Sequence, residues 1–175
     1  MSQPIMKLGG CYMALRQYDK AVPVLRHALE LYPGHTGIEL NLSKALLETK
    51  DFDGAAAMAR DVIARAPMRL TAHTIFERAS LASNHLPEAM KECSTILADL
   101  PDDYDSNLVM GLSLLKLGEQ EAAVTKLKKA ASVQPANPEP HLALAAVYSN
   151  LGQTSDAERE RSEAARLGAT SSTTP

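Results

Sequence analysis

Five histidines and two cysteines are the side chains of this 175-residue chain best suited to nucleophilic, acid–base or metal chemistry. Cys11 and Cys93 lie far apart and form no Cys-x-x-Cys pair, so the sequence predicts neither a disulfide framework nor a thiolate metal site. The histidines belong to no His-Glu-x-x-His helix, and the Gly-x-Ser-x-Gly, P-loop and Gly-x-Gly-x-x-Gly patterns are absent from the sequence. The five are His27, His35, His73, His85 and His141. We therefore predict a protein that is not an enzyme, with no catalytic residue, no cofactor and no metal.

Composition also argues against nucleic acid as a partner. The net charge is −3, the isoelectric point is about 5.9, and aromatic residues make up only 4% of the chain. A nucleic-acid surface needs clustered basic residues or stacking aromatic side chains. Lys126, Lys128 and Lys129 form a small basic cluster, which we interpret as a solvated helix face. The sequence starts with no signal-peptide pattern and has no membrane-length apolar run, so we expect a cytoplasmic protein, or a periplasmic one if a leader is missing.

Proline and alanine recur through the chain with one common period of 34 residues. The prolines are Pro33, Pro67, Pro101 and Pro135, and the alanines are Ala21, Ala55, Ala89, Ala123 and Ala157. A fixed period shared by two residue types indicates a repeat architecture. The pattern divides the chain into five repeats and a polar tail that we expect to be disordered. Their bounds are 2–35, 36–69, 70–103, 104–137, 138–167 and 168–175.

Each repeat has the pattern of two helices joined by a short turn, called here the first and the second helix. In the first repeat, Ile5, Leu8, Tyr12 and Leu15 recur at helical spacing. Asn84, Gly118 and Gly152 mark the break in later repeats. Asp19, Asp53 and Pro87 then share one position, where Asp suits an N-cap and Pro suits a first turn. The periodic alanine is expected where two helices cross closely, and the periodic proline where the second helix stops.

The stretch LGGCYMALRQYDKAVPVLRHALELYP in the first repeat resembles the tetratricopeptide repeat, and the resemblance extends over nearly the whole chain. It implies an all-α, right-handed α-solenoid of five helix–turn–helix repeats, with about ten antiparallel helices. Because one such repeat cannot bury its apolar face alone, neighbouring repeats must stack. It also implies a non-enzymatic protein–protein interaction module, a scaffold or adaptor, that binds a peptide or partner surface in a concave groove.

The family places its groove on fixed positions of the first helices. Carried onto this chain, the groove residues are Met6, Met13, Leu40, Lys44, Leu47, Arg78, Leu81, Leu108, Leu112, Leu115, Lys116 and Leu142. This lining suits an amphipathic helix or an extended peptide. The alternative for each leucine is that it packs between repeats. A subclass of the family clamps terminal carboxylates with Lys, Asn and Arg side chains, but only Asn41 matches that set here, so we reject the clamp.

The third repeat departs from the pattern of the others. Glu77 replaces a small residue, and Ser80 replaces a leucine or an aromatic residue. One interpretation is drift that rotates or opens the helix pair. The other is a polar site where Glu77, Arg78 and His73 meet a ligand, since a buried carboxylate needs a partner.

The N-terminal edge suggests a second hypothesis about function. The first helix offers Ile5, Met6, Leu8, Tyr12 and Met13 with nothing before them, although terminal repeats usually need a polar outer face. The chain would then be a structural or regulatory segment of a larger protein or assembly, docked through this edge by self-association or by an upstream domain.

Overall fold

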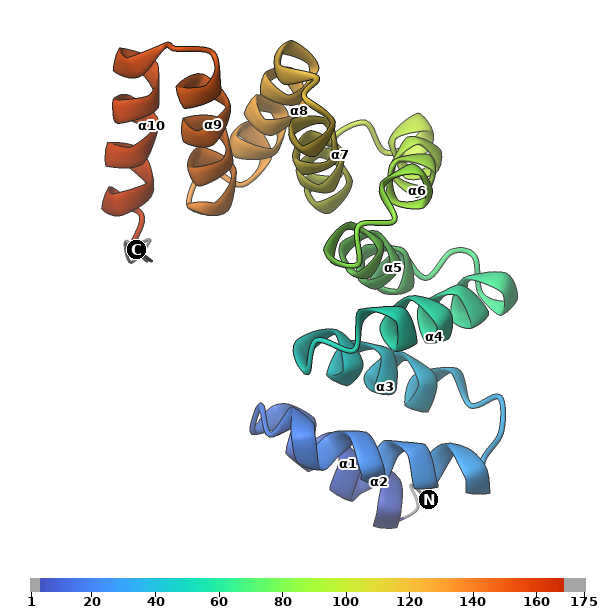
Figure 1. Ribbon diagram of the computed structural model, residues 1–175. Helices are drawn as coiled ribbons and strands as arrows, with labels where there is room; N and C mark the ends of the chain where they lie inside the picture. Colours follow the sequence, from blue (N-terminus) through green and yellow to red (C-terminus); the bar gives the residue numbers. More distant parts are fainter. Residues whose placement is uncertain (1–3, 169–175) are drawn as a thin grey trace. The chain divides into compact units, whose positions relative to one another are not determined.

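The computed structural model describes residues 4–168, which form helices and turns without a strand (Figure 1). The predicted all-α fold is confirmed. The chain order of the helices is α1 (Pro4–Ala14), α2 (Tyr18–Leu31), α3 (Thr36–Glu48), α4 (Phe52–Arg65), α5 (Leu70–Ala82), α6 (Leu86–Asp99), α7 (Tyr104–Leu117), α8 (Gln120–Val133), α9 (Glu139–Asn150) and α10 (Thr154–Arg166). The tail predicted to be disordered lies outside the described residues, apart from Gly168.

The helices belong to two compact units, Met1–Glu88 and Ala89–Pro175, which divide within α6. In the N-terminal unit each helix from α1 to α4 packs on the next one along the chain. In the C-terminal unit α7, α8, α9 and α10 pack in the same way. Helices joined by short connections and packed in chain order form the antiparallel pairs of a helical repeat.

Every first helix ends in the same capping geometry. One residue in each repeat has a positive φ angle at this point, and these residues are Arg16, Lys50, Asn84, Gly118 and Gly152. After α3, the amide of Asp51 donates to the Leu46 carbonyl at 2.9 Å and the amide of Lys50 donates to the Leu47 carbonyl at 3.1 Å. The same pair of hydrogen bonds closes all five first helices, which is the Schellman motif. The sequence indicated three of these breaks and missed the two that carry arginine and lysine.

Substitutions at two equivalent left-handed positions are expected to change the stability of the chain in opposite directions. Lys50→Gly is expected to stabilise the chain by about 0.5–1 kcal/mol, because a side chain with Cβ is strained at a φ of 66°. Gly118→Ala, at a φ of 81°, is expected to destabilise it by about 1 kcal/mol. Urea unfolding followed by circular dichroism measures both, and equal signs would contradict the assignment of strain.

The start of the second helices corrects one detail of the sequence analysis. Asp19 and Asp53 were predicted as N-caps, but both lie in the first turn of their helices. The cap of α4 is Asp51, whose Oδ1 accepts from the Gly54 amide at 3.1 Å. The missed cap directly follows the left-handed Lys50, so Asp51 both closes one helix and opens the next.

The periodic alanines lie in the core, and each of the five has 0% of its surface exposed. A second close approach joins the two helices of a repeat. A Cβ built on Gly111 would lie 2.7 Å from Leu127 Cγ, and one on Gly9 would lie 2.7 Å from Leu25 Cδ2. The second repeat instead carries Ala59 at this position of its second helix, and Ser43 on its first helix. The leucine therefore occupies the space that the glycine leaves.

Candidate partner-binding surface

First helices contact one another within each unit, which places them on the inner side of that unit's bend. α1 contacts α3, α3 contacts α5, and α7 contacts α9, in addition to their contacts with second helices. Within the same units, and among the described residues, α2 does not contact α4 and α8 does not contact α10. A surface made by first helices is therefore continuous inside each unit, whereas the second helices are spread apart.

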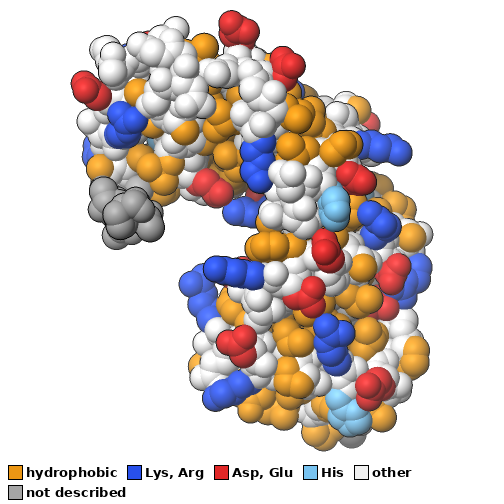
Figure 2. All heavy atoms as spheres, in the orientation of Figure 1, with side chains coloured by type: hydrophobic (Ala, Val, Ile, Leu, Met, Phe, Trp, Pro, Cys, Tyr) orange, Lys and Arg blue, Asp and Glu red, His pale blue; other side chains and the backbone are white. Residues whose placement is uncertain are grey.

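In the N-terminal unit this surface combines half-buried apolar side chains with an exposed cation. Met6 and Met13 lie on α1, and Leu40 and Leu47 lie on α3; all four pack against the hydrophobic core and keep part of their surface open. Lys44 lies between the two leucines at helical spacing and is exposed. On α5, Arg78 and Leu81 are half-buried, and each interacts with other groups of the chain. Figure 2 shows that apolar patches alternate with charges of both signs on the surface.

In the C-terminal unit the predicted groove leucines differ in how far they are exposed. Leu142 on α9 has 49% of its surface exposed, and Leu112 and Leu115 on α7 are half-buried against the core. Lys116 is exposed and interacts within the molecule.

Leu108 is the exception among the predicted groove residues. It has 1% of its surface exposed and belongs to the core cluster that also contains Leu127 and Leu144. Its prediction as a groove residue is wrong, because most residues in the first half of α7 are buried. The polar Ser106, Asn107 and Ser113 are buried as well, so polarity does not mark which side of α7 faces solvent.

Four first helices carry a buried or half-buried polar residue at one common repeat position. The His73 Nε2 donates to the Pro67 carbonyl at 2.7 Å, and the Asn107 Nδ2 donates to the Pro101 carbonyl at 3.0 Å. The signal that could have found them is their spacing of 34 from one another and of six from the periodic proline. Each ties the start of its helix to the preceding turn.

The other two members of this set contact a charged side chain on the second helix of the same repeat: Glu39 forms an ion pair and His141 a hydrogen bond. The Arg65 Nη2 lies 2.5 Å from the Glu39 Oε2, and the His141 Nδ1 lies 2.7 Å from the Glu160 Oε2. The hydrogen bond with Glu39 raises the pKa of Arg65 above its usual value. In the last helix, the hydrogen bond from Arg166 lowers the pKa of Glu163. The Glu39–Arg65 and His141–Glu160 contacts each join the two helices of one repeat, whereas Arg166 and Glu163 both lie within α10.

The hypothesis of a ligand site in the third repeat is not supported by the geometry. Glu77 has 1% of its surface exposed and His73 has 6%. Glu77 and Arg78 interact within the molecule, and His73 is bonded to Pro67. A ligand would have to unpack α5 to reach Glu77 or His73.

No arrangement suited to catalysis emerges from residues 4–168. In that range no group of three or more His, Cys, Asp or Glu side chains could hold a metal ion. Cys93 is buried and Cys11 is exposed. An open depression of about 350 Å³ on the C-terminal unit carries Glu121, Lys128 and Asp156 among its lining residues, so it favours no single ligand charge. None of the described helices is both long and apolar enough to span a bilayer.

Comparison with known proteins identifies the family. A family model described as Tetratricopeptide repeat matches residues 8–75, and one described as TPR repeat matches residues 111–152. The chain belongs to the tetratricopeptide repeat family. Proteins of this family mediate protein–protein interactions and generally have no catalytic activity. No curated protein sequence matches the tetratricopeptide chain.

Solved structures share the fold of this tetratricopeptide chain at low sequence identity. The crystal structure of TTC0263, a thermophilic TPR protein in Thermus thermophilus, has a TM-score of 0.78 at 23% identity, covering 95% of this chain and 91% of that one. A crystal structure of MamA has a TM-score of 0.76 at 17% identity, with 95% and 96% covered. MamA AMB-1 has a TM-score of 0.75 at 19% identity, with 94% and 98% covered. These similarities establish the helical repeat fold.

Proposed function

We propose that this chain is a non-enzymatic interaction module whose first helices bind a peptide or a partner surface. The observation that carries the proposal is the continuity of the first helices within each unit, combined with apolar side chains that remain partly open on them. A surface that is already packed before binding loses little conformational entropy when a ligand docks.

The side chains of the N-terminal unit define the chemistry of the ligand. Met6 and Met13 form one apolar row on α1, and Leu40 and Leu47 form a second on α3. Methionine adapts to different apolar shapes, and the two rows accept alternate side chains of a strand or one face of a helix. Lys44 lies within the second row and supplies a positive charge. We expect a ligand with apolar anchors flanked by an acidic residue.

In the C-terminal unit, Leu112, Leu115, Lys116 and Leu142 offer the same combination of apolar and basic groups. Leu142 is the most open of these leucines, since about half of its surface is exposed. Arg78 and Leu81 complete the proposed surface of the N-terminal unit on α5.

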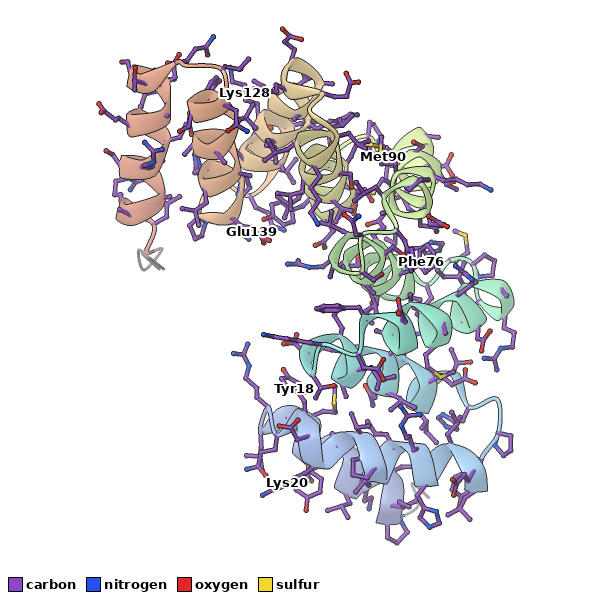
Figure 3. The ribbon with its side chains drawn as sticks, viewed as in Figure 1. Tyr18, Lys20, Phe76, Met90, Lys128 and Glu139 are labelled. Atoms are coloured by element: carbon purple, nitrogen blue, oxygen red, sulfur yellow. The ribbon has the colours of Figure 1, made fainter. Side chains whose placement is uncertain are left out.

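Charge reversal at Lys44 tests the proposal without touching the core. Lys44→Glu is expected to weaken capture of the partner from a source lysate at least about five-fold, because an attraction of about 1 kcal/mol becomes a repulsion. The matched control is Lys20→Glu on α2, labelled in Figure 3, where the same exposed charge lies on a second helix. Quantitative mass spectrometry of the captured proteins measures both variants.

The two variants separate the possible outcomes. Loss of the partner in Lys44→Glu alone supports the first-helix surface. Equal capture by both variants and the wild type, with circular dichroism unchanged, would contradict it and move attention to another face of the chain.

A further inference from the structure

The outer side of α1 carries an apolar stripe that the other first helices bury. Leu8 has 46% of its surface exposed, whereas its repeat equivalents Leu42, Phe76, Met110 and Leu144 have 1%, 6%, 8% and 1%. Cys11 is exposed, whereas Ala45 and Ala79, its equivalents in the N-terminal unit, have 0% exposed. Pro4 is exposed, and Ile38, the corresponding residue of α3, has 2%. Since Pro4, Leu8 and Cys11 are spaced by four and three residues, they lie along one face of the helix.

The molecule itself shows what covers this stripe elsewhere. Within the units, α2 packs on α3, α4 packs on α5, and α8 packs on α9. In each case the covering element is the second helix of the preceding repeat. The guanidinium of Arg60 on α4, for example, lies 5.2 Å from the ring centroid of Phe76, the α5 equivalent of Leu8 (Figure 3).

We propose that the stripe of Pro4, Leu8 and Cys11 is a docking site for an amphipathic helix of a partner protein, seated where the second helix of a preceding repeat would lie. The covering helices specify the chemistry of this partner helix. α2 buries Ala21, Leu25 and Ala28 and adds the half-buried Val22 and Leu29, so the contact face is small and aliphatic. The same chemistry on the partner helix would repeat, on α1, the contact that α2 makes with α3.

A second copy of this chain does not offer such a helix at its other end. At the positions equivalent to Val22 and Leu25, α10 carries the exposed Glu158 and Arg161. Docking α10 on α1 would bury charges against an apolar stripe, which is costly without partners. This inference concerns the outer face of α1 and is independent of the proposed first-helix surface.

The probe for this site is a synthetic peptide with the sequence of residues 18–35, which contains α2. A staple between positions 23 and 27, both exposed in α2, keeps the peptide helical, because isolated helices of this length are marginal in water. The peptide is titrated into the isotopically labelled full chain, and amide chemical shifts locate the contact. We expect saturable shifts on α1, and at least a ten-fold loss of affinity in Leu8→Glu.

Two controls keep the outcome interpretable. Leu117→Glu changes a leucine of similar exposure at the end of α7, outside the proposed first-helix surface, and is expected to leave peptide affinity unchanged. A stapled peptide of residues 154–168, which contains the polar α10, is expected to produce no shifts on α1. Absence of saturable shifts on α1 at millimolar peptide, or equal affinity in Leu8→Glu, would overturn the proposal. Rapid oxidation of the chain to a dimer linked through Cys11 would also overturn it, because the stripe would then belong to a second copy.

Discussion

Leu127→Ala is expected to destabilise the chain by about 2–5 kcal/mol, and Gly111→Ala is expected to recover part of that loss. Leu127 has 0% of its surface exposed and fills the space above Gly111, where a built Cβ would lie 2.7 Å from Leu127 Cγ. Removing the leucine side chain leaves a cavity that the surrounding helices close only in part. In that background the two closest side-chain atoms, Leu127 Cγ and Cδ2, no longer crowd the alanine methyl of Gly111→Ala, which leaves the Leu127 backbone nitrogen at 3.3 Å as its near neighbour. The alanine also raises helix propensity.

The same glycine substitution is expected to have the opposite sign in the wild type. Gly111→Ala alone forces Leu127 to move and is expected to cost about 1 kcal/mol net of the propensity gain. The control is Gly10→Ala, where no atom lies within 4 Å of the built Cβ, so a gain of about 1 kcal/mol is expected. Urea unfolding of the four variants measures the coupling. Additive effects of Gly111→Ala and Leu127→Ala would mean that the two residues are not in contact.

Arg65→Met is expected to destabilise the chain in urea unfolding. The Glu39 side chain is 8% exposed and its Oε2 lies 2.5 Å from the Arg65 Nη2. Without the guanidinium the carboxylate stays buried and uncompensated, which is the costly way to break an ion pair. The Arg65 side chain is 42% exposed, so solvent replaces part of its contribution and the cost lies below that of a fully buried pair. The methionine keeps the apolar stem of the arginine.

The double variant Glu39→Leu, Arg65→Met tests the reason for this loss. Ile5 occupies the equivalent position in the first repeat, so an apolar side chain is compatible with the fold there. We expect the double variant to regain most of the lost stability, because it buries no charge. If the double variant is as unstable as Arg65→Met, the lost stability comes instead from the packing of the aliphatic part of the Arg65 side chain or from the end of α4.

The repeat architecture was predictable because the same types of side chain recur at a fixed spacing along the sequence. The periodic alanines must be small where helices cross, and all of them are buried. Two features were not predicted because they depend on the conformation of the backbone. Arg16 and Lys50 adopt the left-handed conformation that usually signals itself through glycine, and the cap Asp51 is recognisable only once that turn is known.

The candidate surface was predictable to a smaller degree. Helical spacing groups Leu40, Lys44 and Leu47 on one side of α3, and their partial exposure agrees with that grouping. Leu108 was misplaced because α7 buries polar residues such as Asn107 together with its leucines, so only packing decides which leucines are enclosed. His73 and Asn107 were missed as structural ties because their acceptors are backbone carbonyls, which carry no sequence signal.

The central claim is that the partner binds the first helices, and site-specific photo-cross-linking tests it most directly. A photoreactive residue is placed at Lys44 or Leu142 on first helices, and at Lys20 or Ser162 on second helices, all of which are exposed. We expect the captured partner to be cross-linked from Lys44, Leu142 or both, and from neither second-helix position. Cross-linking from Lys20 or Ser162 with none from Lys44 and Leu142 would contradict it.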